Sequence, residues 1–304
     1  MMDTYVSMTV VSESEQSSRE AIEQAFAAIE SFGNRINFYS DKSELAMINR
    51  SAGTEGVSVS TETLDIIDKA VFVADASSGA FDPTIGPLMQ LWNFHNPVKP
   101  RPEDIKSRLP LVNYRHVSID KDRDVVMLKE KNMLLDLGGI AKGYATDIAV
   151  DVLKKNGISS GLVAIAGDIR AFGSKPGGKP WNIGIRNPRQ KNRSDEIIAK
   201  MQLTDKAIST SGDYERFFIQ DGVRYHHLLN PGTGFPATTC RSVSIIADKG
   251  VFADAFSTAV FVLGPEKGMD LIKKMNMEAV IIDNNGTIYT TEALKGKLNF
   301  EKID

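Results

Sequence analysis

Strand-like runs recur along most of the chain, and helical segments do not separate them at regular intervals. The pattern predicts strands at residues 5–11, 116–119, 125–128, 162–165, 181–185, 197–203, 243–246 and 279–282. Asn285-Gly286 then predicts a type I′ hairpin turn, which returns the chain as a strand at residues 287–290. Because strands and helices mix without a βαβ alternation, the sequence predicts an α+β fold.

Three segments show clear helix signals. Ser17 and Glu20 predict a capping box for a helix from Ser17 to about Phe38. Ser60 is a suitable N-cap for a second helix ending at Gly79, and a third begins within residues 138–143 and ends at Gly157. Repeats and long Pro/Ser-rich linkers are absent from the sequence, so we expect one intertwined domain over residues 1–304.

Composition excludes several classes of protein. The hydrophobic and charged fractions, 42% and 25%, are those of a soluble globular chain, and no apolar run is long enough to span a membrane. A net charge of -3 without a Lys/Arg stripe argues against a nucleic-acid partner. As it stands, the chain shows no export signal, which predicts a cytoplasmic location; an exported or lipid-anchored mature form is the alternative.

A glycine pair joins an apolar strand-like run to a helix at residues 134–147. Such a junction directs backbone N–H groups and the helix dipole at an anion, which suits a phosphate. Asp136 and Lys142 flank the glycines with opposite charges, so one can hold a polar ligand group while the other neutralises phosphate oxygen. The alternative is that the glycines serve only close packing.

Hydroxyl residues and histidines gather between residues 207 and 236. Residues 209–213, Ser-Thr-Ser-Gly-Asp, predict a tight polar loop, and residues 230–234, Asn-Pro-Gly-Thr-Gly, are a strong turn signal. A histidine just before such a turn is a candidate general base, because its pKa lies near neutrality. A structural histidine satisfied by the backbone is the alternative.

Two further segments carry candidate binding groups. Asp254 and Thr258 lie four residues apart in a helical segment, so their oxygens share one face and suit one hard cation such as Mg²⁺. Helix capping is the alternative role for this pair. Residues 77–92, rich in small residues and prolines, predict a rigid, exposed loop that contacts a planar ligand.

In their joint order these segments resemble the ApbE family of FAD:protein FMN transferases, formerly described as thiamine-biosynthesis lipoproteins. The resemblance covers nearly the whole chain. Its motifs lie at residues 2–4, 43–49, 79–86, 135–143, 167–169, 209–214, 227–234 and 253–259. Three of them depart slightly from the family pattern: Met-Asp-Thr stands for Met-Gly-Thr, Ala-Gly-Asp for Gly-Gly-Asp, and Asn-Pro for Asp-Pro.

The resemblance implies a T-fold-like α+β architecture of two intertwined lobes, with FAD in the cleft between them. It implies FAD contacts from Met2, Tyr39, Ala80, Phe81, Asp82, Asp136, Lys142 and the Leu228 backbone. It also implies that Mg²⁺ binds the Gly139 carbonyl, Asp254 and Thr258, and that His227 is the catalytic base.

The activity implied by this resemblance is Mg²⁺-dependent transfer of FMN from FAD to a Ser or Thr hydroxyl of an acceptor flavoprotein, with release of AMP. The acceptor is expected to be a subunit of a membrane redox complex. Two alternatives stay open: an FAD pyrophosphatase that yields FMN and AMP, and an FAD-binding protein without turnover. A base at His227 favours an enzyme over a storage protein.

Overall fold

A seven-stranded sheet forms the centre of the molecule. The computed structural model describes residues 4–94, 97–189 and 196–303. The strand order is β1-β5-β6-β9-β12-β13-β14, and each neighbouring pair is antiparallel. The strands are β1 (Val6–Val11), β5 (Ser160–Ile165), β6 (Asp168–Phe172), β9 (Ala207–Gly212), β12 (Cys240–Ala247), β13 (Glu278–Asp283) and β14 (Ile288–Thr290).

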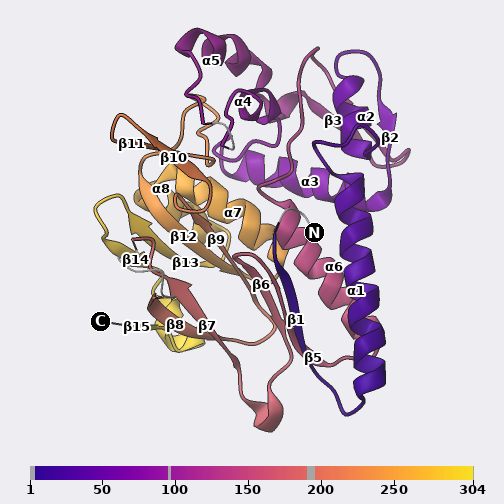
Figure 1. Cartoon of the computed structure of the whole chain (residues 1–304), viewed down its shortest axis with the longest axis vertical. Coiled ribbons are helices and arrows are strands. Elements are labelled where there is room, and N and C mark those ends of the chain that lie inside the picture. The colour runs from indigo at the N-terminus through magenta and orange to yellow at the C-terminus, as the bar shows by residue number, and fades with distance from the viewer. Residues whose placement is uncertain (1–3, 95–96, 190–195, 304) are drawn as a thin grey trace.

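Helices cover one face of this sheet (Figure 1). The longer helices are α1 (Glu15–Arg35), α3 (Thr61–Ala76), α6 (Ala141–Lys155), α7 (Gly250–Leu263) and α8 (Pro265–Lys274). Val243 and Ile245 of β12 face the core beneath these helices, whereas Ile246 faces a second core on the other side of the sheet. This alternation is expected of a strand buried on both faces.

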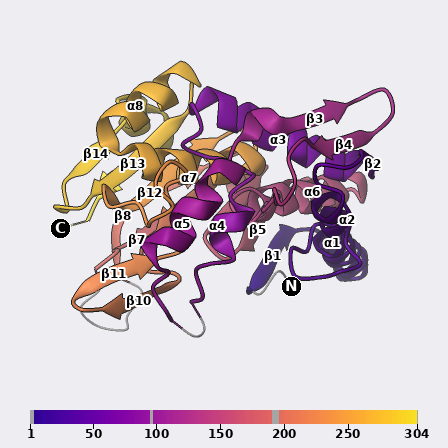
Figure 2. The ribbon, with the colours of Figure 1, turned by 90° about the horizontal axis from the view of Figure 1, so that it is seen from above.

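Smaller elements complete the structure (Figure 2). Three short sheets are present in the described ranges: β15-β8-β7, β2-β4-β3 and the hairpin β10-β11. Their strands are β2 (Val57–Ser58), β3 (Val117–Asp120), β4 (Val125–Leu128), β7 (Trp181–Arg186), β8 (Ile197–Leu203), β10 (Phe217–Gln220), β11 (Val223–His226) and β15 (Glu301–Lys302). The short helices are α2 (Glu44–Arg50), α4 (Gly86–Met89), α5 (Pro102–Arg108) and α9 (Ala293–Leu298).

The α+β class is confirmed, whereas three local predictions are wrong. Helix α1 begins after Ser14, whose side chain accepts the N–H of Ser17, so Ser17 lies inside the helix rather than capping it. Residues 209–212 belong to strand β9 instead of a loop, because each of them pairs with a residue of β12. The β13–β14 hairpin forms, but only Gly286 of its turn has a positive φ, so the turn is not type I′.

None of the helices within the described ranges is long and apolar enough to cross a bilayer. Cys240 is the first residue of β12 and is buried, which agrees with a packing role for the single cysteine of the sequence.

Candidate active site at the contact between helices α6 and α7

Helices α6 and α7 approach each other closely through two glycines. A Cβ atom added at Gly143 would lie 2.1 Å from the Gly250 carbonyl oxygen, and one added at Gly250 would lie 2.3 Å from Thr146 Oγ1. Both oxygens of the Asp147 carboxylate accept backbone N–H groups from the first turn of α7, at 2.9 Å from Gly250 and 3.0 Å from Val251. These contacts fix the start of α7 against α6.

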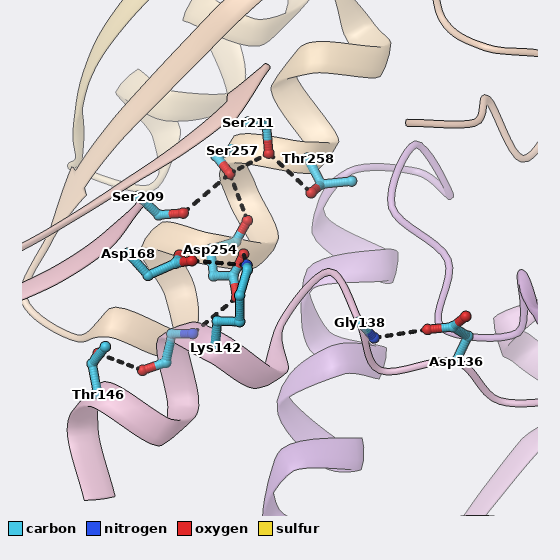
Figure 3. Close-up of polar contacts among 11 residues, drawn as sticks. Asp136, Gly138, Lys142, Thr146, Asp168, Ser209, Ser211, Asp254, Ser257 and Thr258 are labelled. Atoms are coloured by element: carbon cyan, nitrogen blue, oxygen red, sulfur yellow. Dashed lines mark hydrogen bonds and ion pairs between the residues drawn. The ribbon is translucent and has the colours of Figure 1, made fainter. Parts of the chain in front are cut away.

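The close approach brings Lys142 of α6 between two buried carboxylates (Figure 3). Lys142 Nζ lies 2.8 Å from Asp168 Oδ2 and 3.4 Å from Asp254 Oδ1. Asp254 Oδ2 also accepts the Gly143 N–H at 2.9 Å. Asp254 therefore bonds the first turn of another helix, and the alternative that it caps its own helix is wrong.

The charges of this cluster do not balance. Burial alone would lower the pKa of Lys142, but the charges of Asp168 and Asp254 outweigh burial and raise it. Burial and the charge of Asp168 raise the pKa of Asp254 to about 6, even though Lys142 and Gly143 act in the opposite direction. Among the described residues, buried Asp168 Oδ1 has no hydrogen-bond partner. The cluster contains one positive and two negative side chains, so a further cation would be electrostatically favourable there.

Oxygen atoms suited to Mg²⁺ extend from this cluster along α7. A Cβ atom added at Gly139 would lie 3.5 Å from Thr258 Oγ1, which places the glycine pair beside this hydroxyl. Ser211 Oγ lies 3.2 Å from Thr258 Oγ1 and 2.7 Å from Ser257 Oγ. No group of three His, Cys, Asp or Glu side chains converges within the described ranges. A metal here would therefore rely on carboxylate, hydroxyl and carbonyl oxygens, which are the ligands that Mg²⁺ prefers.

The two adjacent histidines have different surroundings. His226 is buried: its Nε2 lies 2.8 Å from the Ala237 carbonyl oxygen, and its Nδ1 accepts the Leu228 N–H at 3.2 Å. The ring of His227 is partly exposed, and its one hydrogen-bond contact within the described ranges is 3.4 Å from Nδ1 to the Arg216 carbonyl oxygen. His226 is thus the backbone-bound histidine, and His227 keeps a ring nitrogen for other chemistry.

Electrostatics keep the His227 imidazole neutral. Desolvation is the main cause of its lowered pKa, about 3, and the positive charges of Arg216 and Lys142 contribute. A neutral imidazole has a lone pair and can accept a proton, but this lowered pKa makes His227 a weaker base than the near-neutral histidine expected from the sequence.

Asp136 lies at the start of the glycine-pair turn. Its Oδ1 accepts the Gly138 N–H at 2.8 Å, and its own N–H donates to the Pro83 carbonyl at 2.8 Å. Desolvation raises the pKa of Asp136, whereas the Gly138 N–H and the charge of Arg216 lower it. Asp136 therefore shapes the turn and links it to the segment that contains residues 80–83.

Residues 80–82 are buried, so the prediction of an exposed loop is wrong. The Asp82 carboxylate accepts the Thr84 N–H at 2.8 Å, the Thr84 hydroxyl at 2.6 Å and the Tyr114 N–H at 3.0 Å. Phe81 reaches the glycine pair, since a Cβ atom at Gly139 would lie 3.2 Å from its ring. The segment can be buried because the Asp82 carboxylate accepts hydrogen bonds from all of these donors.

Asp82 also borders a hollow of about 290 Å³. Its walls are Gly79, Asp82, Val112, Asn113, Tyr114, Arg115, Pro231 and Gly232. A larger hollow of about 600 Å³, lined by residues that include His116, Lys129 and Lys131, contains none of the predicted site residues. The smaller hollow is the one that joins the 79–82 segment to the turn after His227.

The remaining predicted FAD contacts are spread over separate elements. Tyr39 precedes α2, is 83% exposed and packs edge-to-face with Phe38. The Leu228 N–H donates to His226, and its carbonyl accepts the Ala237 N–H at 2.9 Å, so its backbone already has partners in the fold. Met2 lies outside the described residues. The roles of all three stay predictions.

The sequence predicted no role for Asp168, although Asp168 contacts Lys142 at the centre of the site. Ile165 pairs with Asp168 across a two-residue turn in which Ala166 has a φ of 51°. The signal was present, because Ala166-Gly167 follows the strand-like run 162–165, and a small residue with glycine there is typical of a tight hairpin. That turn returns Asp168 to the end of the sheet nearest α6.

The fold and the cluster together define an α+β protein in which a lysine and two buried carboxylates from distant elements meet beside a glycine-pair turn. The ApbE family model matches residues 2–281, and the chain belongs to the ApbE family.

Relatives support this assignment along most of the chain. A protein of Treponema pallidum named FAD:protein FMN transferase is 37% identical over 270 residues, which cover 84% of this chain and 74% of the relative. One of Vibrio cholerae with the same name is 34% identical over 259 residues, covering 84% of this chain and 76% of the relative.

Solved structures agree with the sequence relatives. The crystal structure of the ApbE protein of Thermotoga maritima matches with a TM-score of 0.89 at 36% identity, covering 97% of this chain and 96% of that chain. The flavin transferase ApbE of Vibrio cholerae matches with a TM-score of 0.84 at 29% identity, covering 96% and 95%. The predicted ApbE-like architecture is therefore confirmed.

Proposed function

We propose that this chain transfers the FMN half of FAD to a Ser or Thr hydroxyl of an acceptor flavoprotein in a Mg²⁺-dependent reaction that releases AMP. The observation that carries the proposal is the position of Lys142 between Asp168 and Asp254, three residues after the glycine pair. The name FAD:protein FMN transferase, carried by relatives that match most of the chain, supports the same activity.

The glycine pair and Lys142 would bind the pyrophosphate. The Gly138 and Gly143 N–H groups already donate to Asp136 and Asp254, whereas those of Gly139 and Lys142 have no hydrogen-bond partner among the described residues. Free N–H groups at the start of a helix carry partial positive charge. Lys142 supplies a full positive charge in the same turn, because the carboxylates that flank it keep it protonated. Together they stabilise the negative charge that develops when the pyrophosphate is cleaved.

The oxygens of Asp254 and Thr258, with the Gly139 carbonyl, would hold Mg²⁺ beside the pyrophosphate. The unpartnered Asp168 Oδ1 and the raised pKa of Asp254 fit a bound cation, because a cation would relieve the excess of carboxylate charge. When bound, Mg²⁺ neutralises phosphate oxygens and orients the pyrophosphate. Asp254 must be ionised to bind it.

His227 would accept the proton of the acceptor hydroxyl. The hydroxyl oxygen forms a bond to the phosphorus on the FMN side of FAD, and the bond from that phosphorus to the bridging oxygen breaks. AMP leaves with the bridging oxygen, and the hydroxyl proton moves to the imidazole. Neutral hydroxyls are weak nucleophiles, so a positioned base supplies a substantial part of the rate.

The test is incubation of the protein with FAD, Mg²⁺ and a candidate flavin-acceptor domain, followed by flavin fluorescence in a denaturing gel. The proposal expects a fluorescent acceptor band that depends on Mg²⁺ and disappears in EDTA. Free FMN with an unlabelled acceptor would identify water as the nucleophile and overturn the transferase proposal. FAD binding without FMN or AMP formation would leave a binding protein.

The partner and the location extend the proposal. We infer that the acceptor is a subunit of a membrane redox complex and that the enzyme acts in the compartment of that subunit. Fractionating cells and probing the cytoplasmic and envelope fractions for this chain would test the location.

A further inference from the structure

The β10–β11 hairpin leads directly into His227 and lies at the edge of the molecule, near α4 and α5 (Figure 2). One face of the hairpin packs inward: Phe218 and Tyr225 contact Trp92, with ring centroids 6.4 Å and 5.7 Å away. Trp92 in turn donates its indole N–H to the Gly234 carbonyl at 3.0 Å. The hairpin is therefore held firmly against the rest of the protein.

The outer edge of β10 presents unpaired backbone groups. The His227 N–H donates to the Arg216 carbonyl at 3.1 Å, which makes Arg216 and His227 a hydrogen-bonded pair. Such pairs alternate with non-hydrogen-bonded ones in an antiparallel ladder, so the N–H and C=O groups of Phe217 and Ile219 point away from β11. Neither residue has another backbone partner among the residues that the structure describes.

The opposite edge of the hairpin is less available near His227. The Leu228 carbonyl accepts the Ala237 N–H at 2.9 Å, and Leu229 forms a bridge with Pro236. Residues 236–237 therefore lie along the β11 side as the chain passes His227. On the β11 side the outward main-chain groups belong to the buried His226 and the half-buried Arg224, whereas on the β10 side they belong to the more exposed Phe217 and Ile219.

Side chains along β10 favour an apolar partner with no positive charge. Phe217 is 38% exposed and Ile219 61%, although exposed edge strands are usually protected by charge or proline. The Arg224 guanidinium lies 3.7 Å from the centre of the Phe217 ring, and Arg216 follows at the end nearest His227. An extended peptide with apolar side chains at alternate positions matches this edge.

We propose that the outer edge of β10 receives an extended segment of the acceptor protein as an added strand. The inference rests on the proposed function, since only a protein acceptor has to reach His227 as a polypeptide. An added strand would lie roughly 10 Å from the His227 strand, two strand spacings away, and about three extended residues span that distance. The reactive Ser or Thr therefore follows or precedes the paired segment closely.

Amide-resolved hydrogen exchange tests the added strand without any variant. The probe is the acceptor domain that the wild-type protein labels, added at saturation with no FAD present. We expect exchange at Phe217 and Ile219 to slow at least about tenfold, as hydrogen-bonded amides do, and exchange at Phe218, already in the ladder, to stay unchanged. Unchanged rates at all three amides would overturn the proposal. If exchange at Phe217 and Ile219 slows when the concentration of this protein is raised without any acceptor, the edge pairs with a second copy of the chain. That result would also overturn the proposal.

Ile219→Pro provides the matched kinetic test. Proline removes the outward N–H of Ile219 but no bond to β11, and edge strands tolerate it at such positions. We expect the KM for the acceptor domain to rise about tenfold, because the variant loses one hydrogen bond to the added strand and the proline ring clashes with that strand. The KM for FAD should stay unchanged. Val223→Ala, at a 50%-exposed residue near the hairpin turn, is the control and should stay within about twofold.

The two possible failures look different. If Ile219→Pro labels the acceptor with wild-type KM, the docking edge is refuted and the transferase proposal stands. If the wild-type protein labels no acceptor and releases free FMN, the proposed function has failed before the edge is tested. A change in the KM for FAD in Ile219→Pro would indicate a damaged site and contradict the assignment of the edge to acceptor binding alone.

Discussion

At the scale of single residues, the two adjacent histidines differ in their hydrogen-bond partners, and this difference gives them different roles. His226 uses both ring nitrogens within the fold, whereas the His227 ring has one long hydrogen-bond contact in the described part of the chain. The sequence alone left both interpretations open for this pair. The structure makes His226 the backbone-bound histidine, and the role of His227 as the base stays a prediction.

This difference predicts opposite effects of two alanine substitutions. His227→Ala should lower FMN transfer by about 100-fold to 10,000-fold, the usual loss for a general base, with FAD binding and melting temperature retained. His226→Ala should leave the transfer rate of the folded protein within about tenfold but lower the free energy of unfolding by roughly 1–3 kcal/mol, because buried groups lose their partners. Transfer assays and thermal melts on both variants check this; wild-type transfer by His227→Ala would remove the base.

Asp254 carries the prediction about metal. Asp254→Asn keeps an oxygen for the Gly143 N–H but loses the charge, so we expect activity to fall roughly 100-fold and to stop responding to added Mg²⁺. Asp270→Asn makes the same charge change at an exposed position of α8 and should behave as wild type. Full activity of the wild-type protein in EDTA would refute the metal site.

The same residue predicts a pH-dependent stability. The pKa of Asp254 is raised from 3.8 to about 6, so its ionisation opposes folding as pH rises from 4 to 6 and costs most above 6. In EDTA at pH 7.5, Asp254→Asn should therefore raise the free energy of unfolding by roughly 1–3 kcal/mol. The gain should shrink as the pH is lowered towards 4. Urea titrations at both pH values measure it, and a pH-independent effect would argue against a buried, charged Asp254.

At the scale of elements, the contact between α6 and α7 sets the distance between Lys142 and Asp254. Gly143→Ala would place a methyl group against the Gly250 carbonyl, in a space the backbone occupies. We expect a loss of more than about 3 kcal/mol of stability and of Mg²⁺-dependent activity, since overpacking here moves a whole helix. Gly296→Ala in α9 is the control and should be neutral or slightly stabilising, because among the described residues no atom outside the adjoining helix backbone lies within 4 Å of the added methyl. Wild-type stability of Gly143→Ala would contradict the close approach.

Elements with strong local signals could be predicted from the sequence. Strands β4 and β8 have the predicted bounds, and α3 begins after its predicted cap, Ser60. Strands β9, β10 and β11 could not be found this way, because polar and hydroxyl residues give β9 the composition of a loop while pairing with β12 decides its structure. The buried 80–82 segment was missed for a related reason: Asp82 satisfies donors that only the fold brings to it.

At the scale of the whole molecule, the site draws on three distant parts of the chain. Lys142 lies at the start of α6, Asp168 follows the β5–β6 turn, and Asp254 lies on α7, and the helix-covered sheet brings them together. No local sequence pattern predicts that these three residues come into contact. Their spacing predicted Asp254 and Thr258 as a cation-binding pair, whereas the choice of His227 as the base came from the family resemblance. The structure adds Asp168 and Ser211 to their surroundings. The extent of the domain over residues 1–304 stays a prediction.

The central claim is that one reaction cleaves FAD and labels a protein hydroxyl at this site. The most direct measurement quantifies AMP, free FMN and acceptor-bound FMN in a single reaction with the purified protein, FAD, Mg²⁺ and the acceptor domain. The account predicts one AMP for each FMN found on a Ser or Thr of the acceptor, with little free FMN. AMP matched by free FMN, with the acceptor unmodified, would contradict it.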